Sequence, residues 1–595
     1  MQTSPSHWTN TLPQVGFLRQ AGFLFALLLS GQSQLPALEL DDLFPKDRVV
    51  QVDISISKQN WNRLRRQSRD RGTIGNHQSA PIPSPFTYFD ASVVIDGTRF
   101  DGVGLRKKGF LGSLNSSRPS LKIKLNRLNP DQKLSGVSTL TFNNNLQDHA
   151  LFSQYLSYRM FHRAGLPAPR CAFAHVKVNG KSLGVYSHVE SVKKHFLERE
   201  FGSKEGALYE STIVDFQPGW VNAFELKSGN DEAGRQKITA IIDALGGREG
   251  IPVLDSQATA RAWVPTDPRY DAIWFHPDFD DSKWPSGRNG AGFETQSGYQ
   301  SLIDPAFDFR SQVHGRRRSI YLRIPFELPD AQATRALGNL SLRVRYDDGF
   351  VAYLNGERVA ADNEPQNPAF NSFSTTHHED TDARSFQPFS IADSAHLLRT
   401  GQNVLAIQGL NISESSSDML IDAALQMETH TLEELLSEHI EMDAFYQFWA
   451  TEGLLGFWDG YSGNRNNFFC YHNPGTDKMH FIPWGADSLF TNESLVHDTR
   501  GKPKSVKTFG VIAKRLWSTR GGKARYAQTM KTILDEDWDV QDLIGEIERL
   551  TPTLSPYIHS DQRHYQRAQR EMIRFIRNRR SEVMNEIQVH LPSLN

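Results

Sequence analysis

The chain of 595 residues is long enough for several domains, because one domain typically takes ~100–200 residues. Its 66 basic and 68 acidic residues give a formal net charge of −2, so electrostatics gives no reason to expect nucleic acid or an anionic membrane as a partner. Cys171 and Cys470 are the only cysteines, which excludes a disulfide framework and a cysteine metal site but leaves open whether the two pair.

The N-terminus has the pattern of a secretory signal peptide, which we assign to residues 1–33. Arg19 precedes the apolar run Ala21–Leu29, and the segment Ser30–Ser33 is rich in small residues. The run is too short to cross a bilayer, which takes ~20 residues, and no later segment is long enough. We therefore expect a secreted or envelope-located protein without a transmembrane segment; a buried N-terminal helix is the alternative.

Residues 47–253 predict a set of strands with a helix among them. Val50–Ile56 alternates apolar and polar residues, which is typical of a strand. Asp96-Gly97 and Asn179-Gly180 each separate two apolar runs, which predicts two hairpins. A helix is expected over Ala150–Ala164.

A loop with cations and glycine follows the first hairpin. Arg106, Lys108 and Gly109 lead towards the strand Ser120–Leu125, where Lys122 lies on the face opposite the apolar side chains. Glycine near cationic side chains can present backbone N–H groups to phosphates. A half-exposed strand with a charged outer face is the alternative.

Residues 255–427 predict a separate all-β domain. Many short strands are separated by turns, and hairpin turns are expected at Asp347–Gly349 and Asn355-Gly356. Short strands at close spacing indicate a sandwich or jelly roll. Four aromatic residues are candidates for stacking on sugars, although aromatic residues of sandwiches more often form the core: Trp263, Trp274, Trp284 and Tyr353.

Residues 428–590 return to helical periodicity and contain the candidate catalytic segment. Asp459 precedes Asn464 by five residues, on a loop that nearby glycines are expected to keep out of regular structure. Asn473–Gly475 predicts a hairpin, and Asp487 follows its second strand. Phosphoryl transfer needs a carboxylate near the attacking hydroxyl, plus an amide oxygen and a second carboxylate that hold Mg²⁺. This order is found in protein kinases, although Asp and Asn are also common in turns.

Four stretches in this order resemble the CotH kinase family, which comprises proteins similar to spore coat protein H with a protein-kinase-like fold. They are GLRKKGFLGSLNSSRPSLKIKL, NNNLQDHALFSQYLSYRMFHRAGLPAP, VKVNGKSLGVYSHVESVKKHFL and NRNNFFCYHNPGTDKMHFIPWGADSLF. The resemblance covers about residues 47–250 and 430–590. The runs FDDSKWPSGRNGAGF, YDDGFVAYLNGERVA and NVLAIQGLN resemble galactose-binding-like jelly rolls of carbohydrate-active enzymes.

These resemblances imply an α+β fold in which a bilobal protein-kinase-like domain (47–253 and 428–590) is split by an inserted all-β jelly-roll sandwich (255–427). They imply ATP and Mg²⁺ or Mn²⁺ as cofactors and a protein hydroxyl as the phosphate acceptor. The implied nucleotide-binding residues are Arg106, Lys108, Gly109, Lys122 and Glu190, the last at the hinge between the lobes. Asp459 is implied as the catalytic base, and the implied metal ligands are Asn464, Asn467 and Asp487.

The chain departs from this family at one position of the site. Many relatives carry Asp where this chain has Gly485, so one carboxylate is missing. This departure leaves a second hypothesis open, a non-catalytic pseudokinase scaffold that binds extracellular or cell-wall carbohydrate through the jelly roll. A third hypothesis is ATP-dependent modification of an acceptor that is not a protein.

Overall fold

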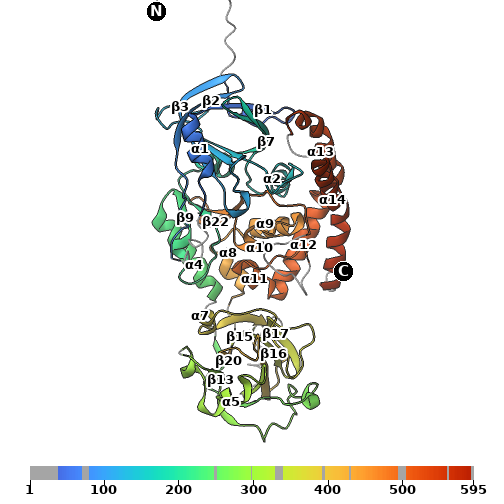
Figure 1. Cartoon of the computed structure of the whole chain (residues 1–595). Helices are drawn as coiled ribbons and strands as arrows, with labels where there is room; N and C mark the ends of the chain where they lie inside the picture. Colours follow the sequence, from blue (N-terminus) through green and yellow to red (C-terminus); the bar gives the residue numbers. More distant parts are fainter. Residues whose placement is uncertain are drawn as a thin grey trace, which may run out of the picture. The chain divides into compact units, whose positions relative to one another are not determined.

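The computed structural model describes residues 38–69, 79–246, 251–296, 298–328, 340–391, 396–427, 430–492, 504–558 and 562–590. The signal peptide predicted over residues 1–33 lies outside them. Helices and strands both make up large parts of the chain, so the predicted α+β class is confirmed (Figure 1). A search of the described residues for a helix long and apolar enough to span a bilayer found none.

Seven strands of the first part close into a barrel in the order β1-β2-β3-β4-β5-β7-β6. Neighbouring strands are antiparallel, except for the parallel pair β1 and β6 that closes the barrel. The strands are β1 (Val50–Ser55), β2 (Phe89–Ile95), β3 (Thr98–Lys108), β4 (Ser120–Lys124), β5 (Thr139–Asn143), β6 (Cys171–Val178) and β7 (Lys181–Val189). The hairpins predicted at Asp96-Gly97 and Asn179-Gly180 are confirmed, and all four residues have positive φ, which Asn, Asp and Gly adopt most easily.

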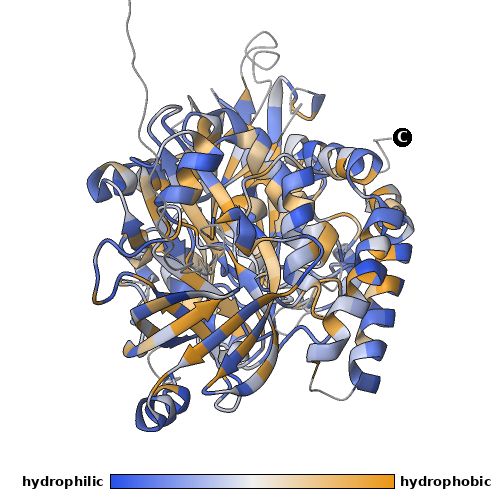
Figure 2. Cartoon of the chain, turned by 90° about the horizontal axis from the view of Figure 1, so that it is seen from above, coloured by the Kyte–Doolittle hydropathy of each residue, from blue (hydrophilic) through white to orange (hydrophobic). Residues whose placement is uncertain are grey.

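Most helices of this part and of the C-terminal part share one hydrophobic core with the barrel. They are α2 (Ser153–Arg163), α4 (Asp231–Gly246), α8 (Leu432–Ser437), α9 (Met442–Leu455), α10 (Tyr461–Asn464), α11 (Val511–Trp517), α12 (Arg520–Glu536), α13 (Val540–Leu554) and α14 (Gln562–His590). Helix α3 (Lys194–Phe201) packs in a smaller cluster with strands of a second sheet, and α1 (Lys58–Arg66) buries Leu64. Figure 2 shows hydrophilic and apolar residues mixed along helices and strands, as expected for elements that bury one face. The predicted helix over Ala150–Ala164 is present, but it begins at Ser153, whose backbone N–H donates to Asp148 Oδ2 at 2.7 Å.

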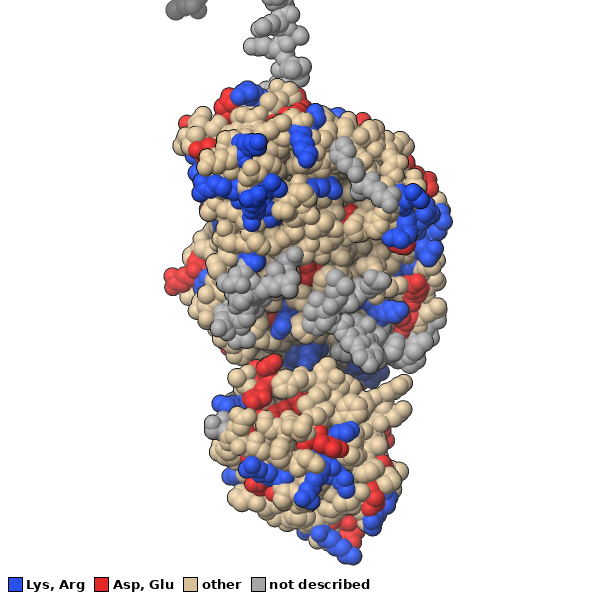
Figure 3. Space-filling model, viewed as in Figure 1, with Lys and Arg blue, Asp and Glu red and all other residues tan. Residues whose placement is uncertain are grey.

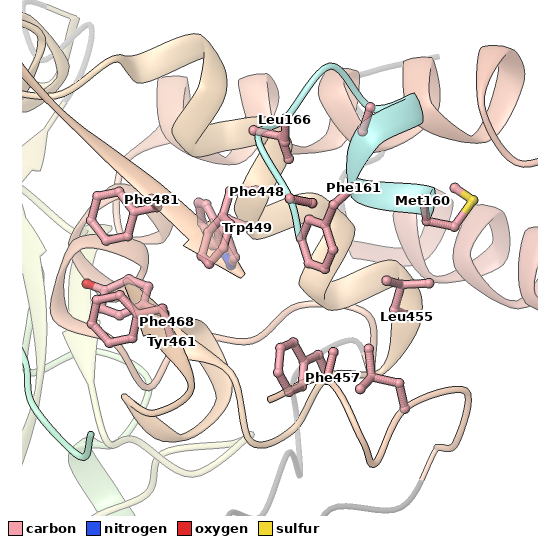
Figure 4. Packing of buried hydrophobic residues seen from close by; sticks show 14 of the residues in the cluster. Met160, Phe161, Leu166, Phe448, Trp449, Leu455, Phe457, Tyr461, Phe468 and Phe481 are labelled. Carbon is pink, nitrogen blue, oxygen red and sulfur yellow. The ribbon is translucent and has the colours of Figure 1, made fainter. Parts of the chain in front are cut away.

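A four-stranded sheet joins the two distant parts of the chain in the order β22-β21-β8-β9. Its strands are β8 (Ala207–Ser211), β9 (Glu225–Ser228), β21 (Phe468–Asn473) and β22 (Lys478–Pro483). The hairpin predicted at Asn473–Gly475 is confirmed, because β21 and β22 are antiparallel with Asn473 opposite Lys478. Figure 4 shows Phe468 and Phe481 of this hairpin close to Tyr461, so the hairpin and α10 pack on each other.

The middle of the chain forms two sheets with a hydrophobic core of their own. One has the order β10-β20-β15-β18 with β13 beside β20; the other has the order β12-β11-β14-β19-β16-β17. The strands are β10 (Ile251–Leu254), β11 (Thr259–Trp263), β12 (Ser286–Arg288), β13 (Ala291–Glu294), β14 (Ser319–Leu328), β15 (Leu340–Asp347), β16 (Gly349–Leu354), β17 (Glu357–Asp362), β18 (Gln387–Ile391), β19 (Gly401–Leu410) and β20 (Asp418–Met427); two short helices are α5 (Arg310–Val313) and α7 (Asp380–Ala383). The boundaries 255 and 427 of an inserted domain stay a prediction.

One of the two predicted hairpin turns in the middle is wrong. Asn355-Gly356 does join the antiparallel strands β16 and β17. At Asp347–Gly349, however, the chain passes from one sheet to the other, because β15 pairs with β18 and β20 whereas β16 pairs with β17 and β19. The buried Asp348 carboxylate fixes this crossing by accepting the backbone N–H groups of His378 and Ile412.

Candidate active site

Strands β3 and β4 bring the predicted cationic residues together. Arg106 lies directly opposite Lys122 in the strand register, and Lys108 lies two pairs further along, opposite Ser120. Gly109 has φ +124°, and a Cβ there would lie 2.5 Å from Ser113 Oγ, so the turn after β3 requires glycine. The barrel thus presents Arg106, Lys108 and Lys122 from one surface, and their role in nucleotide binding stays a prediction.

The electrostatics of the two lysines show what they face. Burial lowers the pKa of Lys122 to about 7; the charge of Glu210 opposes this shift, and the charge of Arg106 adds to it. Burial also lowers the pKa of Lys108, against the effects of Asp487 and Glu210. Both lysines are therefore within interaction range of β8, and Lys108 is also close to the carboxylate that follows β22.

The predicted catalytic segment is held by a buried glutamate. The carboxylate of Glu452 in α9 accepts the backbone N–H groups of Tyr461 at 2.9 Å and Ser462 at 2.8 Å, together with the Ser462 hydroxyl. These N–H groups belong to the first turn of α10, where intrahelical partners are lacking. The expectation that residues 460–463 lie outside regular structure is therefore wrong, because Glu452 stabilises one helical turn there. A Cβ at Gly460 would lie 2.2 Å from Glu452 Oε1, so glycine is required for this approach.

Three side-chain amides surround the carboxylate of Asp459. Asn464 and Asn466 donate to its Oδ1 at 2.7 and 3.1 Å, and Asn467 donates to its Oδ2 at 2.8 Å. Burial raises the pKa of Asp459, and the three amide hydrogen bonds act in the opposite direction. This arrangement fixes the orientation of the carboxylate without a cation, which keeps it available as an acceptor for a further polar group.

Asp487 is held against the barrel by a residue from β5. Asn143 Nδ2 donates to Asp487 Oδ2 at 3.1 Å, while Asn143 Oδ1 accepts the hydroxyl of Ser120 at 3.3 Å. Burial raises the pKa of Asp487 to about 6; the Asn143 hydrogen bond and Lys108 act against this shift, whereas the charge of Asp459 adds to it. Lys108 and Asp459 therefore both lie within electrostatic interaction range of Asp487, where the barrel meets the segment after β22.

The predicted hinge residue Glu190 has a different environment. Its carboxylate is 5% exposed and forms ion pairs with Arg170 at 3.1 Å and Arg199 at 2.5 Å. Glu190 also lines a pocket of about 300 Å³, together with residues of β5, β7 and β9 and with Leu208 of β8. Because two arginines already bind the carboxylate, we expect any nucleotide contact there to come from the surrounding backbone; the nucleotide contact of Glu190 stays a prediction.

The oxygen atoms at Asp459 and Asp487 are of the kind that a hard divalent cation binds. Asn464 and Asn467 donate to Asp459 through Nδ2, and an Asn side chain would coordinate a metal ion through its Oδ1 atom. Two carboxylates and amide oxygens are the ligand types that Mg²⁺ and Mn²⁺ accept. The excess of cations on β3 and β4 and the pocket beside Glu190 likewise fit a nucleotide with its phosphates.

Several residues of this site were not predicted from the sequence. Asn143 carries no signal of its own, and neither does Asn466, which lies between the two predicted metal ligands. Glu210 and Glu452 carry no local signal, because Glu210 lies on a short strand and Glu452 within a helix. The run Asn464–Asn467 contained a signal in its three amides, but only the fold shows that all three converge on Asp459.

The aromatic residues proposed to stack on sugars lie mainly inside the middle part. Trp274 and Trp284 are buried, and Trp274 stacks on Tyr321 with ring centroids 3.9 Å apart. Trp263 and Tyr353 are half-buried and pack against this cluster. Trp274 and Trp284 therefore serve the core, and these two rings are not available as platforms for a sugar.

Fold and site define an α+β protein in which a seven-stranded barrel presents lysines to a segment rich in carboxylates and amides. The chain belongs to the CotH kinase protein family, whose sequence profile matches residues 105–245 and 376–583, more than half of the chain. The family resemblance seen in the sequence is thereby confirmed.

Other comparisons add little to this assignment. None of the curated proteins that were compared matches the chain. Among solved structures, it is similar to Bacteroides uniformis beta-glucuronidase 2 bound to a cyclophellitol-6-carboxylate aziridine (14% identity, 28% of this chain and 17% of that chain, TM-score 0.17). It is also similar to a beta-glycosidase from Bacteroides vulgatus (12%, 29% and 20%, TM-score 0.16) and to a beta-glucuronidase of an uncultured Clostridium species (14%, 29% and 28%, TM-score 0.17). The chain spans less than a third of the length of each, and the low TM-scores carry no argument.

Proposed function

We propose that this protein is a CotH-type kinase that transfers the γ-phosphate of ATP to a protein hydroxyl with Mg²⁺ or Mn²⁺. The observation that carries the proposal is that Lys108 and Asp459 both lie within electrostatic interaction range of the Asp487 carboxylate, which Asn143 holds. Phosphoryl transfer is catalysed mainly by positioning and by electrostatic stabilisation, and such a group of residues supplies both. The barrel and the helical part would correspond to the two lobes of a kinase, and the middle sheets to an inserted jelly roll.

Each residue then has a defined task. Lys108 and Lys122 bind and orient phosphate oxygens, and the pocket beside Glu190 accepts the base. Asp487, with Asn464 and Asn467, would hold the metal ion, which neutralises charge on the phosphates when it is bound. Asp459 accepts the proton of the acceptor hydroxyl, and Asn466 helps to keep its carboxylate in place.

The test is a transfer assay with purified full-length protein. The protein is incubated with γ-labelled ATP and Mg²⁺ or Mn²⁺, and label on protein is measured before and after treatment with EDTA. Metal-dependent labelling of the protein or of an added protein supports the proposal, and Asp459→Asn should reduce the rate by ~10²–10⁴-fold, as for loss of a catalytic base. Absence of label under all conditions favours the scaffold hypothesis.

We also propose that the protein acts outside the cytoplasm, in secreted form or in the cell envelope. The apolar run Ala21–Leu29 with its basic flank and the small residues after it supports this. N-terminal sequencing of protein exported by its native host should find a start after about residue 30. A mature chain that begins at Met1 would contradict the proposal.

A further inference from the structure

Two arginines bind adjacent residues of one segment, because Arg69 donates to the carbonyl oxygen of Pro83 and Arg106 donates to the hydroxyl of Ser84. Arg106 is on β3, and Arg69 is on the segment between α1 and β2, outside the barrel strands. Burial lowers the pKa of Arg69; Glu225 opposes this shift, and the neighbouring charge of Arg106 adds to it. Two guanidinium groups within interaction range repel each other, so a bound anion would stabilise the pair.

Each guanidinium group makes a hydrogen bond and lies over an aromatic ring. Arg69 donates to the carbonyl oxygen of Pro83 at 2.8 Å and lies 4.8 Å from the ring centroid of Phe110. Arg106 donates to Ser84 Oγ at 3.1 Å and lies 5.3 Å from the ring centroid of Tyr88. The segments that carry them are tied together as well, since Gln67 Nε2 donates to Thr87 Oγ1 at 2.8 Å.

A buried lysine fixes this arrangement to the barrel. Lys107 of β3 is 3% exposed, and its Nζ donates to the carbonyl oxygens of Arg65 at 3.1 Å and Gln67 at 2.7 Å. A cation at the C-terminal end of α1 is favoured by the helix dipole. The position of Arg69 relative to Arg106 is therefore set by the fold and not by a flexible side chain alone.

The donors of the two arginines are incompletely used. Their Nε atoms are buried and have no hydrogen-bond partner among the described residues. The nearest carboxylates are already occupied, because Lys227 forms ion pairs with Glu210 at 2.5 Å and Glu225 at 2.6 Å. Figure 3 shows Lys and Arg side chains gathered over α1 and β3, at the upper left of that view, with few acidic side chains between them.

We propose that Arg69 and Arg106 form a carboxylate-binding site for an acidic segment of the acceptor protein. Guanidinium groups match the planar carboxylate in a bidentate geometry, and rigid donors bind it with little loss of entropy. The proposed function assigns Lys108 and Lys122 to the phosphates, whereas Arg69 lies on a segment outside the barrel strands. This inference rests on the proposed function in one respect: the proposed function makes the protein that carries the acidic segment the acceptor of the phosphate.

The test measures peptide binding without nucleotide, using full-length protein and fluorescence anisotropy. One labelled probe is a serine peptide flanked by glutamates, and the other has glutamine at the same positions. The wild type should bind the acidic probe and not the neutral one. Arg69→Gln and Arg106→Gln should each weaken binding about tenfold or more, the effect of losing one charge-assisted hydrogen bond. The matched control Arg66→Gln changes an exposed arginine of α1 and should leave binding unchanged.

Two further measurements keep the outcomes distinct. Mg·ATP affinity, measured by calorimetry, should not change in Arg69→Gln; a loss of nucleotide affinity with unchanged peptide binding would show that the pair holds a nucleotide phosphate and would overturn the proposal. Equal binding of both probes would overturn it too. If Arg69→Gln does not fold, Arg69→Lys keeps the charge and should still weaken binding, because it loses the bidentate geometry. Peptide binding without any phosphate transfer would refute the proposed kinase activity but leave this site standing.

Discussion

A Cβ atom on Gly485 would lie 2.5 Å from Oδ1 of Asn467. Gly485 also has φ +57°, a backbone conformation that residues other than Gly, Asn and Asp rarely adopt. The same Asn467 donates through Nδ2 to Asp459. The amide of Asn467 therefore occupies the space that a side chain at position 485 would need.

An Asp side chain at position 485 should consequently destabilise the protein. Gly485→Asp should lower the free energy of unfolding by about 1–3 kcal/mol, because its side chain would overpack against Asn467. In a double-mutant cycle with Asn467→Ser, the combined loss measured by chemical denaturation should be smaller than the sum of the single losses. Strictly additive losses would mean that the two positions do not compete for space.

Glu452 should matter for transfer although it lies behind the catalytic segment. Glu452→Gln replaces one acceptor by a donor that faces the N–H groups of Tyr461 and Ser462, and we expect a loss of about 1–3 kcal/mol in unfolding free energy. The transfer rate at saturating ATP should also fall, because Asp459 follows the same segment, while nucleotide affinity should change little. Glu205→Gln, on the surface, is the control. Equal losses of affinity and rate would assign Glu452 to general stability alone.

The pKa of Lys122 predicts how nucleotide affinity depends on pH. A phosphate needs the protonated lysine, and in the free protein the pKa of Lys122 is lowered to about 7. Below pH 7, titration of Lys122 should therefore leave nucleotide affinity nearly constant. Above pH 7, the affinity should fall ~tenfold per pH unit until the pH reaches the pKa of Lys122 in the nucleotide complex. Proton uptake on binding, measured by calorimetry in buffers of different ionisation enthalpy, checks the sign. Lys122→Arg stays charged and should remove this dependence; if it does not, another group titrates.

The sequence predicted the local features of the site better than its contacts. The two barrel hairpins depend on residue pairs that favour positive φ, and the strand of Lys122 depends on its alternation, so both could be recognised from neighbouring residues. The Asn143–Asp487 hydrogen bond joins residues 344 positions apart and leaves no trace in a local pattern. The hairpin turn predicted at Asp347–Gly349 was wrong for the same reason. Residues typical of a turn are also found where a chain passes from one sheet to another.

The middle of the chain should fold without the rest. Its sheets bury a hydrophobic core of their own, and an autonomous domain needs such a core. A fragment of residues 255–427 should be soluble and unfold cooperatively, as followed by circular dichroism on heating. Aggregation or a gradual loss of signal would contradict the predicted boundaries; extending the fragment to begin at residue 247 would then show whether the first boundary is at fault.

The most direct measurement is a calorimetric titration of the full-length protein with ATP, with and without Mg²⁺. We predict binding that depends on the metal, that is weakened at least about tenfold in Asp487→Asn through loss of a charged ligand, and that is nearly unchanged in Asp459→Asn. The difference between the two variants follows from their places in the proposed site, Asp487 against the metal and Asp459 towards the acceptor. An Asp487→Asn variant that binds Mg·ATP like the wild type would contradict the assignment of Asp487 as a metal ligand. A wild-type protein that binds no nucleotide would contradict the proposed kinase activity.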